Sequence, residues 1–170
     1  GALTENGPFR AAANGTSLYT APYSWNKRAS MLFVEQPLFV GYSISDDPRD
    51  AITDDEINAQ RLVTFVVRFL EKFPQYKTNE FYLSSESCAH ASAVRHTEPH
   101  ARHFTLPCAD GGHYVPMTSR ALLAYNRELL RLGREGINFR GALVGNPYTN
   151  LVENTFGLVD AIWGHALIPT

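Results

Sequence analysis

The stretch FYLSSESCA, residues 81–89, joins a short apolar segment to a serine-rich one. Its first three residues have the composition of a strand. Ser87 follows them, and the residues two places before and after that serine, Ser85 and Ala89, are both small. A nucleophile elbow needs small residues at those places, because its tight turn brings them against a neighbouring strand and helix. The pattern therefore predicts Ser87 as a nucleophile, and the alternative is a polar loop at the end of a strand.

The segments around this stretch alternate between strand and helix patterns. A capping box at 53–56, with Thr53 as the cap, precedes a helix predicted over 54–72. The apolar stripe of this helix would run through Ile57 and Phe65, with Val66 beside it. The other expected elements are helices at 117–132 and about 155–167, and strands at 31–34, 81–83 and 139–145. This order of strands and helices predicts an α/β fold with a largely parallel sheet.

Length, composition and charge narrow the classes of protein to which the chain can belong. Its 170 residues are 44% hydrophobic and 19% charged, which is typical of one globular domain. A formal net charge of −2 does not favour nucleic acid or an anionic membrane as a partner. The two cysteines, Cys88 and Cys108, are too few to indicate a redox compartment. The chain begins at Gly1 without an initiator methionine, so we expect a piece of a longer protein.

One segment, residues 89–111, breaks the alternation. It holds four of the six histidines and two prolines, and it has no apolar periodicity. We expect this segment to be a disordered insertion of 22 residues, at either 89–110 or 90–111. A metal site is the alternative, and its ligands would be His90, His96, His100, His103 and Cys108. The spacing of these residues matches neither a zinc finger nor a helical ligand pair, so the sequence does not favour a metal.

Across that segment, residues 85–89 and 112–116 join into the run SESCAGHYVP. This run resembles the signature of the serine carboxypeptidase family, which usually reads GESYAGHYVP. Further blocks are similar to the family in the same order: Glu5–Phe9, Tyr23–Asn26, Leu32–Pro37, Phe73–Tyr76, Ile137–Gly141, Val144–Pro147 and Trp163–Ile168. The resemblance covers nearly the whole chain except residues 89–111.

The resemblance implies one partial α/β-hydrolase domain over residues 1–170, with a mostly parallel, incomplete sheet flanked by helices. It implies removal of C-terminal residues from peptides through an acyl-enzyme on Ser87, with the backbone N–H of Cys88 as an oxyanion donor. Glu5 and Glu86 match the family's pair that binds the substrate's free C-terminal carboxylate. Three carboxylates in one site must share protons, which favours binding at acidic pH.

We expect no cofactor, metal ion, nucleic acid or membrane as a partner. The resemblance points to the secretory pathway, a vacuole or lysosome, or the extracellular space as the location. The family's catalytic Asp and His would lie beyond residue 170, so we expect little or no peptidase activity from these residues alone. His90, His113 and His165 are not expected to replace that base. Phe39 stands where the family usually has Gly, a residue suited to a positive φ angle or a close backbone approach.

Two alternatives stay open beside the carboxypeptidase. One is a carboxypeptidase-like acyltransferase, which would pass the acyl group to an alcohol in place of water. The other is a non-catalytic pseudoenzyme or an incomplete gene product. The insertion and Phe39 support the second alternative.

A retained intron, translated in frame, is our hypothesis for the extra 22 residues, because the family motif reads cleanly on both sides of them. Twenty-two codons make 66 nucleotides (22 × 3). We predict that amplification of the transcript across the codons for Ser84 to Pro116 gives a product shorter by that length. A mature transcript that still encodes all 22 residues would contradict the hypothesis and favour the pseudoenzyme.

Overall fold

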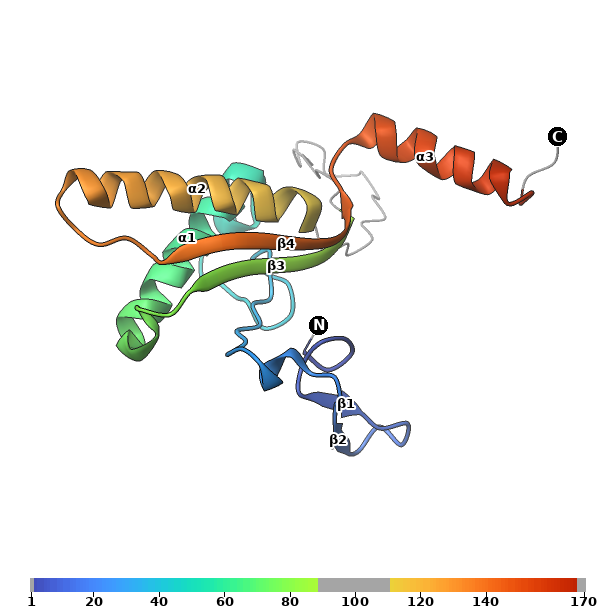
Figure 1. Ribbon diagram of the computed structural model, residues 1–170, viewed down its shortest axis with the longest axis horizontal. Coiled ribbons are helices and arrows are strands. Elements are labelled where there is room, and N and C mark those ends of the chain that lie inside the picture. Colours follow the sequence, from blue (N-terminus) through green and yellow to red (C-terminus); the bar gives the residue numbers. More distant parts are fainter. Residues whose placement is uncertain (1, 89–110, 168–170) are drawn as a thin grey trace. The chain divides into compact units, whose positions relative to one another are not determined.

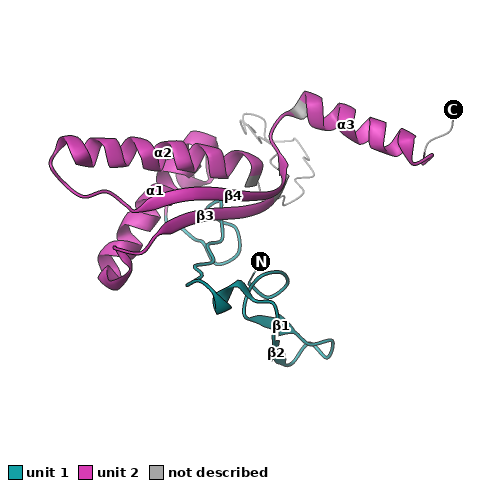
Figure 2. Cartoon of the chain, viewed as in Figure 1, with its two compact units in different colours: residues 1–46 teal, residues 47–170 magenta. Residues whose placement is uncertain are grey.

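A computed structural model describes residues 2–88 and 111–167 (Figure 1). The chain divides into two compact units, Gly1–Asp46 and Asp47–Thr170 (Figure 2). The expected insertion and the alternative metal ligands lie, apart from Gly111, outside the described residues. Both therefore stay predictions.

A short antiparallel hairpin forms part of the first unit. Strand β1 (Phe9–Ala11) pairs with strand β2 (Leu18–Thr20). In the turn between them, the side-chain oxygen of Asn14 accepts hydrogen bonds from the Thr16 N–H and the Ser17 hydroxyl, both 3.1 Å long. Asn favours turns because its side chain can satisfy backbone groups two or three residues further on.

The strand expected at residues 31–34 is not formed. Residues 30–36, which follow the 3-10 helix η1 (Trp25–Lys27), have no regular secondary structure. The side chains of Leu32, Phe33 and Val34 are exposed. A strand is stabilised by pairing with a neighbour, and no strand in the described part of the chain pairs with this run. The apolar composition alone was not sufficient to form the element.

The turn after this run holds Phe39 with a φ angle of 72°. This angle confirms the expectation of a positive φ at this position. Left-handed backbone costs a residue that has a side chain about 1–2 kcal/mol. Hydrogen bonds hold the turn in this shape. The Phe39 N–H donates to the Ser43 carbonyl at 2.6 Å, and the Tyr42 N–H donates to the Glu35 carboxylate at 2.5 Å.

The second unit contains the helix α1 (Asp55–Lys72), close to its predicted bounds. The predicted cap was wrong by one residue, because Asp54 is the N-cap and its carboxylate accepts the Ile57 N–H at 2.8 Å. A charged cap also interacts favourably with the positive end of the helix dipole, which a threonine does not. The Thr53 hydroxyl instead donates to Asn58 Oδ1. Two 3-10 helices flank α1: η2 (Pro48–Ala51) and η3 (Pro74–Tyr76).

The buried face of α1 also differs from the predicted stripe. Val66, which was expected beside the stripe, is buried, but so are Ala59 and Val63, and Phe65 is exposed. Positions 59, 63 and 66 fit the 3.6-residue helical period as well as the predicted stripe does. The helix α2 (Gly111–Arg131) packs on that side. Contact with α2 therefore selects one of two apolar faces of α1.

The core forms where α2 lies along two parallel strands (Figure 1). Strand β3 (Phe81–Cys88) pairs in parallel with strand β4 (Phe139–Tyr148), and α2 lies between them in the chain. Leu122 of α2 is fully buried in a cluster with Val63, Val66 and Ile137. Burial of one such side chain stabilises the fold by about 1.5–3 kcal/mol. The parallel β3–α2–β4 order confirms the predicted α/β class.

The last helix, α3 (Leu151–Gly164), begins about four residues earlier than predicted. Asn150 caps it, because its side-chain oxygen accepts the N–H groups of Val152 and Glu153. Large apolar side chains of this helix, Phe156 among them, are exposed. In the described part of the chain, no helix combines the length and the apolar character needed to cross a membrane.

Helix α2 begins at Gly111, six residues before the predicted start, and continues through Pro116. Its second residue, Gly112, is buried against Tyr148 at the end of β4. A Cβ atom on Gly112 would lie 2.4 Å from the Tyr148 carbonyl oxygen, far inside van der Waals contact. The helix therefore approaches the strand this closely only because residue 112 has no side chain.

We predict that Gly112→Ala destabilises the protein by about 1–3 kcal/mol, because the added methyl overpacks a contact with backbone that cannot rotate away. The measurement is the free energy of unfolding in urea. Gly157→Ala in α3 is the matched control, since a Cβ there meets nothing within 4 Å. In that helix the alanine should stabilise by about 0.5–1 kcal/mol. Equal effects of the two substitutions would contradict the close approach.

Candidate functional site

Ser87 lies in β3, near the carboxyl end of the strand. The strand continues to Cys88, α2 begins at Gly111, and the described residues include no tight strand-to-helix turn at the serine. The pairing of β3 with β4 shifts register between Glu86 and Cys88, so the ladder is irregular at this point. Functional sites of α/β folds gather at strand carboxyl ends. The roles of Ser87 as nucleophile and of Cys88 as oxyanion donor stay predictions.

The side chains of β3 alternate between the core and an open face of the sheet. Phe81 and Leu83 pack against the core cluster. Because successive strand residues point to opposite sides, the residues between them face away from that cluster. The open face consists of Tyr82, Ser84 and Glu86 from β3 and of Gly141, Leu143 and Gly145 from β4, paired in that order. Its two large side chains with apolar surface are about half exposed, Tyr82 at 51% and Leu143 at 50%.

Glu86 ends the open face, one residue before the predicted nucleophile. Its side chain is exposed, and its neighbour across the strand pair is Gly145. A Cβ atom on Gly145 would lie 3.4 Å from Glu86 Cγ. Among the residues that the structure describes, none forms an ion pair or hydrogen bond with the Glu86 carboxylate. This carboxylate is therefore accessible to a ligand.

Glu5, the predicted partner of Glu86, lies in the first unit and is exposed. Its neighbours are held firmly within that unit. The Asn6 carbonyl accepts the Trp25 N–H at 3.0 Å, and Gly7 is buried so closely that a Cβ would overlap the backbone of Ala2. The pairing of Glu5 with Glu86 joins two separate units and stays a prediction.

His113 takes part in a contact between helices. Its Nδ1 atom, in the first turn of α2, lies 3.0 Å from Asp55 Oδ2 at the start of α1. Arg120 of α2 pairs with Glu56, the next residue of α1. The two contacts connect the first turn of α1 to α2, one at the start of α2 and one near its middle. His113 therefore has a structural role, and the expectation that it is not the catalytic base stays a prediction.

The other histidines and the alternative metal ligands form no site in the described residues. His165 is exposed at the C-cap of α3. His90 and the rest of the metal set lie outside the described residues. Within residues 2–88 and 111–167, no three His, Cys, Asp or Glu side chains are arranged to hold a metal ion.

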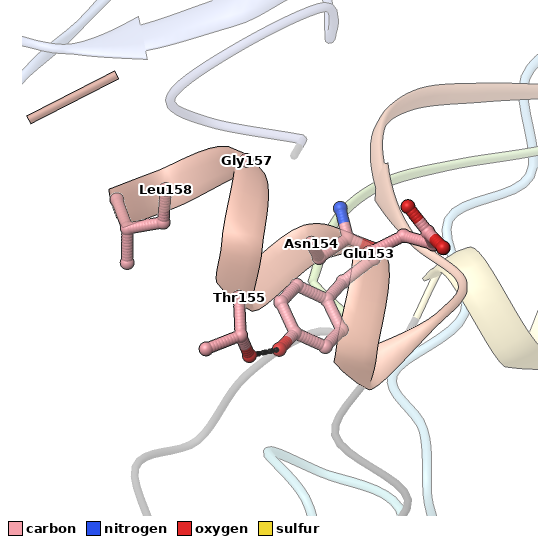
Figure 3. A pocket seen from close by; sticks show the side chains of 6 residues that line it. Glu153, Asn154, Thr155, Gly157 and Leu158 are labelled. Carbon is pink, nitrogen blue, oxygen red and sulfur yellow. Dashed lines mark hydrogen bonds between the residues drawn. The ribbon is translucent and has the colours of Figure 1, made fainter. Parts of the chain in front are cut away.

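A shallow hollow of about 450 Å³ lies at the start of α3 (Figure 3). Tyr148 and residues of α3 line it, and the Tyr148 hydroxyl lies 3.2 Å from Thr155 Oγ1. None of the predicted residues Glu5, Glu86 and Ser87 lines this hollow. Its position therefore gives no support to the predicted site.

Comparison with known proteins decides the family. A sequence model of serine carboxypeptidases matches residues 1–91 and 109–170. The chain belongs to the serine carboxypeptidase family. The residues that this match leaves out, 92–108, all lie within the predicted insertion.

Curated serine carboxypeptidase relatives match nearly all of the chain but only part of their own length. Serine carboxypeptidase-like 44 of Arabidopsis thaliana is 35% identical over 168 residues, which are 99% of this chain and 30% of that protein. Serine carboxypeptidase 24 of the same plant is 36% identical over 169 residues, 99% and 31% of the two chains. Serine carboxypeptidase-like 26 of Oryza sativa subsp. japonica is also 36% identical, with 99% and 30% covered. The chain thus spans about 30% of the length of these serine carboxypeptidase relatives.

Sequence reasoning missed that Gly145 lies opposite Glu86 and that Tyr82 shares the open face with Glu86. The period of two along a strand was a usable signal, because it places Tyr82 and Glu86 on one side of the strand. No pattern within one strand shows what lies opposite, because that depends on the pairing register. Gly145 was therefore not predictable as the neighbour of Glu86.

The open face also carries a phenol with a perturbed pKa. The Tyr82 hydroxyl donates a hydrogen bond of 3.1 Å to Glu80 Oε2. This hydrogen bond, with desolvation and the charge of the Glu80 carboxylate, raises the pKa of Tyr82 above its ordinary value, while Arg140 acts in the opposite direction. The pKa rises because loss of the proton would break the bond and bring two negative charges together.

We predict that Glu80→Gln lowers the pKa of Tyr82 toward its ordinary value. The measurement is a pH titration of the Tyr82 side-chain NMR signal, assigned with Tyr82→Phe. Since the folded-state pKa is raised, the stabilisation is present below the unfolded-state pKa and is lost as the pH rises through the folded-state pKa. Glu86→Gln, on the same face but further along the strand, should leave the titration unchanged. An unaltered pKa in Glu80→Gln would contradict this account.

Proposed function

We propose that the complete protein carrying this chain is a serine-type carboxypeptidase, which hydrolyses C-terminal residues from peptides. The family match on both sides of Ser87 is the observation that carries the proposal. The position of Ser87 at the carboxyl end of β3, within a parallel β3–α2–β4 unit, supports it, because sites in α/β sheets gather at such strand ends.

In this proposal, Ser87 Oγ attacks the carbonyl carbon of the last peptide bond. A general base takes the hydroxyl proton and then gives it to the leaving amine as the C–N bond breaks, which leaves an acyl-enzyme ester. Water then hydrolyses the ester and frees the serine. The backbone N–H of Cys88 stabilises the negative oxygen of each tetrahedral intermediate. The base and its Asp partner would come from outside the 170 residues.

Glu86 and Glu5 would bind the free carboxylate at the C-terminus of the peptide. The exposure of Glu86 beside Ser87 supports this role. Two glutamates and a substrate carboxylate must share protons to lie together, so binding should be strongest at acidic pH. Serine carboxypeptidases are generally secretory or vacuolar proteins, and we propose such a compartment, or the extracellular space, for the complete protein.

One observation favours a pseudoenzyme as the second candidate. β3 continues to Cys88 and α2 begins at Gly111, so 22 residues, 89–110, separate the serine motif from the helix that would follow an elbow. Small displacements of a nucleophile cost large factors in rate. An acyltransferase would use the same acyl-enzyme, and analysis of the products from a peptide and from an ester donor with an alcohol acceptor would distinguish it.

A serine-directed fluorophosphonate probe tests the nucleophile. We expect the complete protein to be labelled and Ser87→Ala to lose both the label and about a millionfold in kcat, since the nucleophile has no substitute. Ser84→Ala is the matched control, because Ser84 is an exposed serine of the same strand. It should retain labelling.

A complete protein that is not labelled at Ser87 would contradict the carboxypeptidase and support the pseudoenzyme. A variant of the complete protein that lacks residues 89–110 then identifies the cause of the missing label. Labelling that appears only after this deletion would assign the loss to the insertion. No labelling in either version would exclude Ser87 as an active nucleophile.

A further inference from the structure

We propose that the complete protein carries an N-linked oligosaccharide on Asn14, in the turn of the β1–β2 hairpin. Asn14, Gly15 and Thr16 form the acceptor sequence Asn-X-Thr, in which X is any residue except proline. No other asparagine of the chain is followed two places later by serine or threonine. The inference rests on the proposed secretory compartment, because this modification belongs to secreted proteins.

The acceptor sequence is open to solvent within its unit. It lies between β1 and β2, and all three of its residues are exposed. Gly15 has a φ angle of 70°, and a Cβ atom on it would meet nothing within 4 Å. A glycan is bulky and hydrated, and the turn leaves it room.

The turn lies at the opposite end of the hairpin from the buried part of the unit. At the buried end, Ala21 is 1% exposed and its N–H donates to the Pro8 carbonyl at 2.8 Å. At the turn, the Ala12 N–H donates to the Ser17 carbonyl at 2.9 Å and closes the loop that contains Asn14. A group added to Asn14 therefore displaces no buried contact of the unit.

The hydrogen bonds of the Asn14 amide leave its nitrogen available. Its Oδ1 atom accepts the Thr16 N–H and the Ser17 hydroxyl, both at 3.1 Å. Among the residues that the structure describes, none is hydrogen-bonded to Asn14 Nδ2. A sugar attached to Nδ2 leaves Oδ1 free to accept, so the turn keeps both hydrogen bonds after modification.

The co-reactant is an oligosaccharide joined to a polyprenol through diphosphate. Asn14 Nδ2 attacks the anomeric carbon of the first sugar, and a C–N bond forms as the C–O bond to the diphosphate breaks. The nitrogen loses one proton, and the polyprenyl diphosphate leaves with the electron pair of the broken bond. The transfer therefore needs no oxidant or reductant.

A glycan on Asn14 constrains the complete protein. The chain spans about 30% of the length of its relatives, so most of the protein lies outside it. A hydrated oligosaccharide must stay in solvent. The remaining residues must therefore leave the turn between β1 and β2 uncovered.

The experiment uses the complete protein, purified from eukaryotic cells and digested with trypsin. Cleavage after Arg10 and Lys27 gives the peptide 11–27, which contains both Asn14 and Asn26. A peptide-N-glycosidase in water labelled with heavy oxygen converts a glycosylated asparagine to a labelled aspartate, which mass spectrometry locates. We expect the label at Asn14 and not at Asn26, and no label when the glycosidase is left out.

Two hydroxyl residues of the same turn give matched variants. Thr16→Ala removes the hydroxyl of the acceptor sequence but keeps the N–H that bonds to Asn14, and it should abolish the label. Ser17→Ala removes a hydroxyl that contacts Asn14 but lies outside the acceptor sequence, and it should retain the label. Thr16→Ser should also retain it. An unlabelled Asn14 in the wild type, or a label that survives in Thr16→Ala, would overturn the inference.

Failure of the proposed function has a different signature, which the fluorophosphonate probe and fractionation of the same cells reveal. A protein that reacts with the probe at Ser87 but is unmodified at Asn14 would keep the carboxypeptidase and overturn the inference. A protein modified at Asn14 that does not react at Ser87 would support the inference and contradict the carboxypeptidase. An unmodified protein found outside the secretory pathway would overturn the proposed compartment and the inference together.

Discussion

The parallel pairing of β3 with β4 beside α2 is the constraint on which the rest of the second unit depends. Parallel strands cannot be joined by a tight hairpin, so the connection must cross over the sheet, and α2 lies in that connection. The helix reaches β4 closely because Gly112 has no side chain against the Tyr148 backbone. Once the helix is in place, Leu122 closes the core and the strand register is set. That register decides which residues share the open face.

The surroundings of Ser87 follow from the same pairing. Glu86 reaches the open face because strand side chains alternate, and Gly145 lies opposite it because the register aligns the two residues. Glu5 belongs to another unit. All-parallel sheets are normally covered on both faces, and here the chain has about 30% of the length of its relatives. An incomplete α/β-hydrolase sheet accounts for the exposed Tyr82 and Leu143.

Local signals predicted the elements well where the deciding forces were local. The bounds of α1 follow from its acidic first turn and from Pro74. The positive φ at Phe39 was expected from the resemblance to the family, which usually has glycine there. The predicted cap failed by one residue, because Thr53 and Asp54 are both good capping residues and the charge of Asp54 adds a favourable interaction with the helix dipole. The strand at 31–34 failed because a strand needs a partner, and local composition cannot supply one.

The sequence by itself determined the family, the α/β class and the bounds of α1, whereas the strand predicted to end before Ser87 continues through Cys88. The family, the class and these bounds depend on motif order and on periodicity within single segments, both of which can be read from the sequence directly. Only the tertiary structure decided which face of α1 is buried, that Gly112 abuts Tyr148 and that Gly145 lies beside Glu86. Each of these depends on contacts between segments far apart in the chain, and such contacts are set by packing and strand register, which no local pattern contains.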